Sequence, residues 1–298
     1  MPPILTIDPG DSVVFRTLDA HWGEFEQADP YQEPRAFQQR QGTLDSGHAL
    51  CGPVAIRGAR PGMTLEIHIK GIRPGRWGWS SAGGFPTGFN RRLGVAEGER
   101  RILRWRLNPD AGTAVNASGR TIPIRPFLGV IGMPPAIRGT HSTIPPRASG
   151  GNLDCKELVA GSRLFLPVTV PGGLVSAGDG HAVQGDGEVS GIALECPIER
   201  AELEFQLHDG PPLSMPRANA PVGWITFGLH ASLDEAWVMA VEGMLDLMGS
   251  EFGVERREAL NLCSLLVDLR VTQVVNDVQG VHAILPHGLL RSSAPELG

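Results

Sequence analysis

Residues 65–70 read Leu-Glu-Ile-His-Ile-Lys, and this stretch sets the expectation for the fold. Leu65, Ile67 and Ile69 alternate with polar residues, so an extended strand here would have one apolar and one polar face. Similar short apolar runs, separated by glycine and proline, recur at residues 13–15, 54–56, 122–124 and 164–166. Frequent short strands with turn residues between them predict a mainly β fold, either a jelly-roll-like β-sandwich or a barrel.

The pattern changes after Gly228, where helical spacing replaces alternation. Residues 232–235 have the spacing of a capping box, and the apolar residues that follow predict a helix ending at Gly249. A second helix is expected from Val254 to about Val267, followed by a strand over residues 269–275. We therefore expect residues 1–225 to form the β-rich body. Residues 226–298 would form a mixed α/β part with two helices, packed on the body as a single compact unit.

A tryptophan-containing stretch between Pro74 and Phe89 carries five glycines and two prolines, which predicts a long irregular loop. Trp77 and Trp79 lie within it. They would either form part of a ligand-binding surface or pack into a core or a dimer contact, and the packing interpretation is favoured.

Composition excludes several classes of function. The 298 residues carry 26 Lys+Arg against 32 Asp+Glu, a formal charge of −6, so no basic surface for nucleic acid is expected. No apolar run is long enough to span a membrane. The first ten residues lack the charge and apolar pattern of a signal peptide. Four scattered cysteines with no C-x-x-C pair favour a reducing compartment, and we expect a cytoplasmic location.

Ionisable residues suited to metal or acid–base chemistry gather in residues 178–188, which read Gly-Asp-Gly-His-Ala-Val-Gln-Gly-Asp-Gly-Glu. Asp179 and His181 would share one face of a strand, as would Asp186 and Glu188. A carboxylate beside an imidazole is a ligand pair for Zn²⁺. The same glycine-rich pattern is also typical of tight turns, so both interpretations stay open. A further strand is expected over residues 189–194, before Glu195.

Two other segments offer candidates. Asn152 and Asp154 follow Gly150-Gly151 and would share a face if the segment is extended. A structural role, in which the side chain hydrogen-bonds the loop backbone as in an Asx-turn, explains these residues equally well. His48 precedes a Gly-Pro turn and is either a further ligand or structural.

Covalent mechanisms fit the sequence poorly. Ser80-Ser81 resembles part of the serine-dependent amidase pattern, but that mechanism requires a lysine base, and neither Lys70 nor Lys156 stands in a matching context. Cys155-Lys156-Glu157 contains the residue types of a nitrilase triad. Three consecutive residues cannot converge on one substrate carbon.

These segments together resemble the acetamidase/formamidase family. The matching motifs run nearly from end to end of the chain: His48 to Pro53, Gly58 to Gly62, Pro145 to Arg147, Gly150 to Asp154, Gly178 to Glu188, and Asp268 through Pro286. The resemblance implies a β-sandwich with α/β additions, a homodimer, and hydrolysis of short aliphatic amides to ammonia and a carboxylate. Because an amide carbonyl is a poor electrophile, we expect the attacking water to be activated by a metal.

From the resemblance we expect a divalent metal, Zn²⁺ with Ca²⁺ as the alternative. The expected ligands are His48, Asp154, Asp179, His181 and Glu195. Glu188 is the expected acid–base group, with Asp186 beside it and Asn152 holding the amide.

Two rival hypotheses stay open. One is amide hydrolysis by Cys155, and the other is a Ca²⁺- or sugar-binding β-sandwich without turnover.

Overall fold

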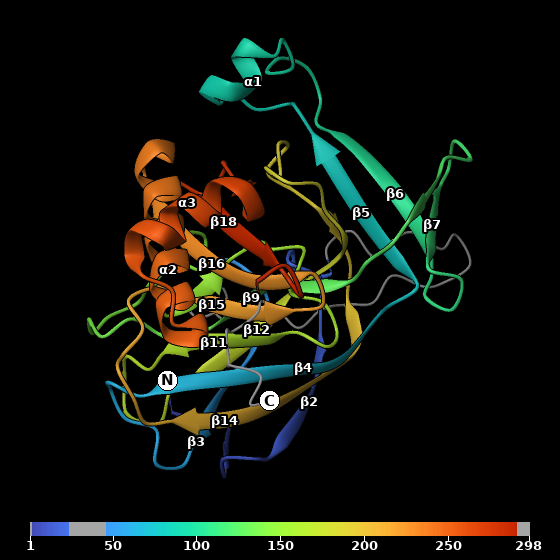
Figure 1. The fold of residues 1–298 in the computed structure, drawn as a ribbon. Coiled ribbons are helices and arrows are strands. Elements are labelled where there is room, and N and C mark those ends of the chain that lie inside the picture. Colours follow the sequence, from blue (N-terminus) through green and yellow to red (C-terminus); the bar gives the residue numbers. More distant parts are fainter. Residues whose placement is uncertain (1, 24–45, 291–298) are drawn as a thin grey trace.

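The computed structural model describes residues 2–23 and 46–290, and these form two β-sheets, with two longer helices together on one side and a short helix apart from them (Figure 1). The second sheet has eight strands in the order β17 (Asp268–Gln273), β18 (Gln279–Pro286), β16 (Gly223–His230), β15 (Arg217–Ala220), β11 (Arg163–Pro167), β4 (Thr64–Pro74), β14 (Ile198–His208) and β2 (Ser12–Thr17).

The first sheet has ten strands. Its main path is β1 (Leu5–Ile7), β3 (Leu50–Ile56), β12 (Val175–Val183), β13 (Leu194–Glu195), β5 (Trp77–Ala82), β6 (Arg101–Asn108), β7 (Thr113–Asn116) and β8 (Thr121–Pro123). Off this path, β9 (Phe127–Gly132) pairs with β12 and with β10 (Gly150–Asn152). Among the described residues neither sheet closes on itself, so the mainly β sandwich is confirmed and the barrel alternative is wrong.

The core lies where the sheets face each other, and β4 shows why these residues form a strand. Leu65, Ile67 and Ile69 are fully buried, whereas His68 and Lys70 on the opposite face are more exposed. Burying each aliphatic side chain contributes about 1.5–3 kcal/mol, so the alternation both defines and stabilises this strand. Glu66 is also buried on the outer face, where its carboxylate accepts hydrogen bonds from Arg163 and His208.

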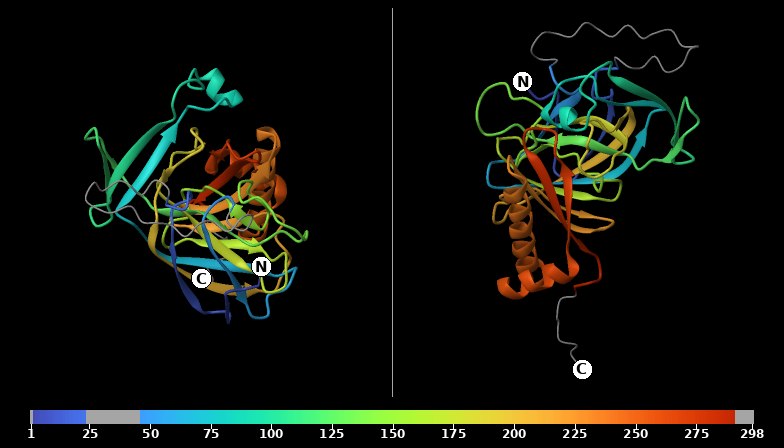
Figure 2. Two further views of the ribbon diagram at one scale, coloured as in Figure 1. Left: turned by 180° about the vertical axis from the view of Figure 1, so that it is seen from behind. Right: turned by 90° about the horizontal axis from the view of Figure 1, so that it is seen from above.

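The helices are α1 (Gly88–Arg92), α2 (Leu233–Phe252) and α3 (Arg256–Leu266). Figure 2 shows α2 and α3 together on one side of the molecule, away from β6 and β7. Buried α2 residues, including Ala240 and Met244, form a second core with β18 residues such as Ala283. Among the described residues, no helix combines the length and the apolar character needed to cross a membrane.

Two details of the expected helices are wrong. The Ser232 side chain makes no capping hydrogen bond, so the capping box does not form. The first helix continues through Gly249 to Phe252, because Gly253 adopts the left-handed conformation (φ 68°) that ends it. The second helix and the strand that follows it are confirmed as α3 and β17.

Two expectations about loops are also wrong. Residues 77–82 of the expected irregular loop form β5, paired on both sides, and Trp79 is fully buried. The packing interpretation of Trp79 is therefore confirmed. The strand expected over residues 189–194 is instead a turn-rich loop, and only Leu194 and Glu195 pair with β12.

Candidate functional site

The densest group of buried ionisable side chains lies around β12 in the first sheet. Asp179 and His181 are both on β12, and Glu195 on β13 is the register partner of His181. Asp154 follows β10, and Glu188 lies in the loop after β12. All five residues are buried, so four carboxyl groups and an imidazole share one interior region. We call these residues the carboxylate cluster.

Two overlapping ligand groups form within the carboxylate cluster. Asp154, His181 and Glu188 make one, and Asp179, His181 and Glu195 make the other. In each group the potential ligand atoms lie within 4.8 Å of one another. His181 Nε2 lies 3.3 Å from Asp179 Oδ1 and 3.4 Å from Glu195 Oε1. Within each group, the imidazole and the two carboxylates are therefore close enough to coordinate a small cation.

The backbone under this cluster is irregular. Asp154, Asp179 and Glu188 have φ values of 50°, 57° and 45°, in the left-handed region that side chains seldom adopt. Each such residue costs of order 1–3 kcal/mol, and such residues gather at functional sites. The positive φ at Asp179 lies inside a strand, so the surrounding sheet must impose it.

Gly129 on β9 provides the space that the side chains occupy. A Cβ at this position would lie 2.8 Å from His181 Cε1 and 2.9 Å from Asp154 Oδ1, and closer still to Asp179 Oδ2. Since no side chain fits there, the absence of a Cβ allows the three ligand candidates to approach one another.

Two amide side chains orient members of the carboxylate cluster. His181 Nδ1 donates to Gln184 Oε1 (3.0 Å), while Gln184 Nε2 donates to the backbone oxygen of Asp154 (2.8 Å). This arrangement places the proton on Nδ1 and leaves Nε2 toward the carboxylates, as in many metal-ligating histidines. Asn276 Nδ2 donates to Asp154 Oδ2 at 2.8 Å.

Burial and mutual repulsion dominate the electrostatics. Burial, with further contributions from Asp179 and Glu195, raises the pKa of Asp154 to about 8 despite the opposing effect of His181. Burial also raises the pKa of Glu195 and, together with the Asp154 charge, raises that of Glu188 well above its ordinary value.

The pKa values of His181 and Asp179 shift in the directions that favour the charged form of each side chain. Burial lowers the pKa of His181, but Glu195 and Asp179 outweigh it, so that pKa lies well above its ordinary value. Burial raises the pKa of Asp179, but His181 and His48 outweigh it and hold that pKa below its ordinary value.

Three of the expected site residues lie outside the two ligand groups. His48 is half-buried, and its Nδ1 lies 2.8 Å from Thr143 Oγ1. It nevertheless contributes to lowering the pKa of Asp179. Asn152 Nδ2 donates to the backbone oxygen of Ile144 (3.0 Å). Asp186 forms ion pairs with Lys156 (2.9 Å) and Arg270 (3.3 Å).

Sequence reasoning missed Gly129, Gln184 and Asn276. Gln184 follows His181 by three residues within the glycine-rich motif, and that proximity is the one local signal for it. Asn276 and Asp154 are 122 residues apart, and no spacing in the chain connects them.

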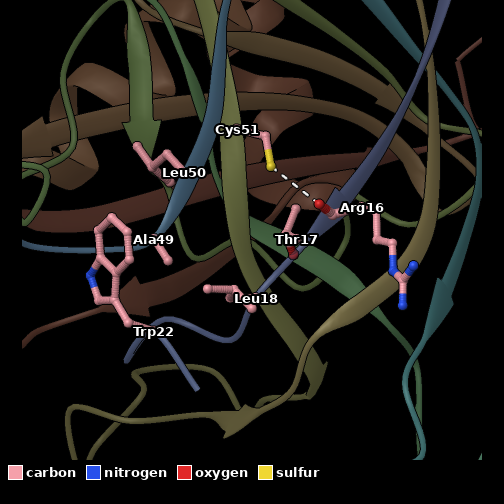
Figure 3. Close-up of a pocket in the computed structure, with 7 residues that line it drawn as sticks. All are labelled: Arg16, Thr17, Leu18, Trp22, Ala49, Leu50 and Cys51. Atoms are coloured by element: carbon pink, nitrogen blue, oxygen red, sulfur yellow. Dashed lines mark hydrogen bonds between the residues drawn. The ribbon is translucent and has the colours of Figure 1, made fainter. Parts of the chain in front are cut away.

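A cavity of about 400 Å³ adjoins the start of β3 (Figure 3). It is lined by Arg16, Thr17, Leu18, Trp22, Ala49, Leu50 and Cys51. Leu50 pairs with Gly178, the residue before Asp179, but the cluster side chains do not line this cavity. Cys51 Sγ donates to the backbone oxygen of Arg16 (3.2 Å).

The fold and the carboxylate cluster together define a β-sandwich with an acidic, metal-competent site. The family model described as "Acetamidase/Formamidase family" matches residues 1–139 and 136–290. The chain therefore belongs to the acetamidase/formamidase family.

Individual relatives agree with that assignment. An acetamidase of Mycolicibacterium smegmatis is 26% identical over 79% of this chain and 73% of its own length. A formamidase of Methylophilus methylotrophus is 26% identical over 64% of this chain and 58% of its own length, so the chain spans about three fifths to three quarters of these curated relatives. The crystal structure of an acetamidase from Bacillus halodurans superposes with a TM-score of 0.81 at 27% identity, covering 96% of this chain and 92% of that one.

Proposed function

We propose that this protein hydrolyses short aliphatic amides to ammonia and a carboxylate at the carboxylate cluster, using a divalent metal ion. The observation that carries the proposal is the pair of buried ligand groups sharing His181. The names of the relatives, acetamidase and formamidase, support the substrate class.

The residues present fit a bound cation. Asp154 Oδ1 and Glu195 Oε2 are buried and have no hydrogen-bond partner among the described residues. Such atoms cost free energy when unpaired, and a positive ion would satisfy both. Asp154, Asp179, His181 and Glu195 are the proposed ligands, with His48 as a further candidate beside Asp179. A nitrogen ligand among carboxylates favours Zn²⁺ over Ca²⁺, which takes oxygen ligands.

A divalent ion bound at this position supplies Lewis acidity, which polarises a carbonyl and makes water a better nucleophile. Glu188 is the proposed acid–base group, because its carboxyl belongs to the same cluster and its raised pKa makes it a stronger base than an ordinary carboxylate. It would accept a proton from water and return it to the departing nitrogen.

Asn152 is the proposed amide-binding residue. Its Nδ2 is engaged with Ile144, while its Oδ1 is buried without a partner among the described residues. A buried carbonyl oxygen of this kind can accept an N–H of the substrate amide. Asp186 is not assigned a chemical step, since its carboxylate is bound by two cations.

The rival mechanism through Cys155 has little support from the site. The thiol is fully buried and burial raises its pKa to about 12, which disfavours the reactive thiolate. The side chains of Lys156 and Glu157 form ion pairs with Asp186 and Arg125. A binding module that uses Trp79 to stack a sugar is equally disfavoured, because that ring is buried. The cytoplasmic location and the homodimer stay predictions.

The decisive experiment measures ammonia release from formamide, acetamide and propionamide before and after a chelator, and after adding Zn²⁺ back. We expect activity to disappear with the metal and to return with Zn²⁺. Activity that survives complete metal removal but is abolished by a thiol alkylator would contradict the proposal and favour Cys155. An ammonia yield of zero from all three amides would contradict the substrate class.

A further inference from the structure

The turn between β17 and β18 reaches the carboxylate cluster from the second sheet. Its Asn276 donates to Asp154 Oδ2 at 2.8 Å, while Asp154 Oδ1 is buried without a partner among the described residues. Oδ1 is also the atom that a Cβ on Gly129 would meet, so it lies on the side of the cluster near His181. The two oxygens of this carboxylate therefore have different surroundings.

The turn that carries Asn276 is held by a buried glutamine. Gln273 is fully buried, and its Oε1 accepts hydrogen bonds from the backbone nitrogens of Val275 (3.0 Å) and Asn276 (3.2 Å). Its Nε2 donates to the backbone oxygen of Val278 at 2.6 Å. These bonds fix the backbone of the turn independently of Asp154, so the Asn276 side chain starts from a backbone that is already held in place.

The base of the same turn is tied to the loop that carries Glu188. The Gly187 nitrogen donates to the Thr272 oxygen (3.0 Å), and the Val274 nitrogen donates to the Gly187 oxygen (3.2 Å). One structural unit thus positions both Asn276 and Glu188 against Asp154.

We propose that Asn276 is a positioning residue that occupies Asp154 Oδ2 and so presents Oδ1 alone to the metal. A carboxylate with both oxygens free can rotate or bind an ion through both. With one oxygen hydrogen-bonded, it offers a single ligand atom in one direction. Outer hydrogen bonds of this kind typically alter metal affinity by about 10–100-fold. This inference rests on the proposed metal-dependent function.

A purely structural role is the competing explanation, in which Asn276 only joins the two sheets. Such a role would lower the stability of the metal-free protein and leave metal affinity unchanged. A positioning role predicts weaker metal binding as well, beyond any loss of stability, because Gln273 and the Gly187 hydrogen bonds hold the turn without Asn276.

The test compares Asn276→Leu, which keeps the shape and removes the donor, with Asn276→Ser, whose side chain is shorter. The matched control is Asp277→Asn, an exposed neighbour with φ of 62°, a conformation that asparagine tolerates. Zn²⁺ affinity of the full chain is measured by competition with a chelating indicator. Thermal unfolding of the metal-free protein and the separate values of kcat and KM at saturating Zn²⁺ are also measured.

We expect both Asn276 variants to bind Zn²⁺ about 10–100-fold more weakly and the control to bind like the wild type. The metal-free unfolding midpoints of both variants should fall slightly, since Asp154 Oδ2 loses its partner, and kcat should fall with KM unchanged. Wild-type Zn²⁺ affinity in the variants, or equal weakening in Asp277→Asn, would overturn the inference while leaving the proposed function standing. A wild-type chain that binds no Zn²⁺ would overturn both.

Discussion

Strands β4 and β12 lie in different sheets and differ in side-chain burial and in backbone regularity. Along β4, aliphatic residues alternate with polar ones, and Leu65, Ile67 and Ile69 are fully buried in the core. Strand β12 is buried on both faces over most of its length, and a residue with φ of 57°, Asp179, interrupts it. The regular strand contributes stability, whereas the irregular strand positions charged groups at a cost in stability.

The largest expected difference is between the effects of substituting two buried carboxyl groups, Glu188 in the loop after β12 and Glu66 in β4. Glu188→Gln should lower ammonia release by about 10²–10⁴-fold, since the proton-transfer group is lost. Its metal-free unfolding midpoint should stay equal or rise, because burial and the Asp154 charge raise the pKa of Glu188 and its ionised form therefore destabilises the fold.

Glu66→Gln is the matched variant in the second sheet. It should leave turnover unchanged and lower the free energy of unfolding by about 1 kcal/mol, a small loss because the Arg163 and His208 partners are half-exposed and screened. Steady-state kinetics and thermal unfolding of both variants check the pair. Normal turnover in Glu188→Gln would remove the acid–base role.

A second contrast uses two glycines. Gly129→Ala should lower activity by about 10²-fold, because a Cβ there displaces Asp179, His181 and Asp154 and reactive groups tolerate little displacement. Gly71→Ala in β4 meets no atom within 4 Å, so activity should be unchanged and stability should rise by about 0.5 kcal/mol. Steady-state ammonia release and unfolding curves of the two variants check these expectations. If Gly129→Ala kept as much activity as Gly71→Ala, the site would tolerate displacement of these side chains and the prediction would be wrong.

The last expected effect is on the pH dependence of stability. In the metal-free protein Asp154 has its pKa raised from 3.8 to about 8, so the folded state holds a proton that the unfolded state has lost. Stability should therefore fall as pH rises from about 4 to about 8. The pKa of Asp179 is lowered, so its own contribution to the pH dependence of stability lies below this pH range.

Saturating Zn²⁺ should remove this decline, since a bound cation favours the ionised carboxylates. Unfolding midpoints between pH 5 and 8.5, with chelator and with Zn²⁺, give the measurement. A metal-free midpoint that rises with pH would contradict the assigned pKa direction.

Local sequence patterns predicted the regular parts of the molecule well. Alternation in residues 65–70 located β4, and helical spacing located α2 and α3, because these elements repeat one backbone geometry. The glycines and prolines of residues 74–89 indicated a loop, but pairing with β6 and β13 outweighs that local preference and forms β5.

Prediction of the site was less complete, and the reasons are physical. Asp179 and His181 are candidates from strand spacing, and Glu195 from its position after the strand expected over residues 189–194. The positive φ values, in contrast, depend on contacts with β9 and the second sheet. Gly129 acts by lacking a side chain, and no spacing in the sequence distinguishes it from other strand glycines. Asn276 acts through a contact that forms only after the sheets pack.

The order of strands in the second sheet has a consequence for how the protein is made. β17 forms one edge and β2 the other, so the sheet spans almost the whole chain, and the turn bearing Asn276 comes from its last hairpin. A ribosome releases Asp154, His181 and Glu188 long before residues 268–286. Emerging chains would thus carry an unfinished acidic pocket until that hairpin has been made, and truncated products would have the ligands without the turn that orients them. Long-range pairing of this kind also slows folding.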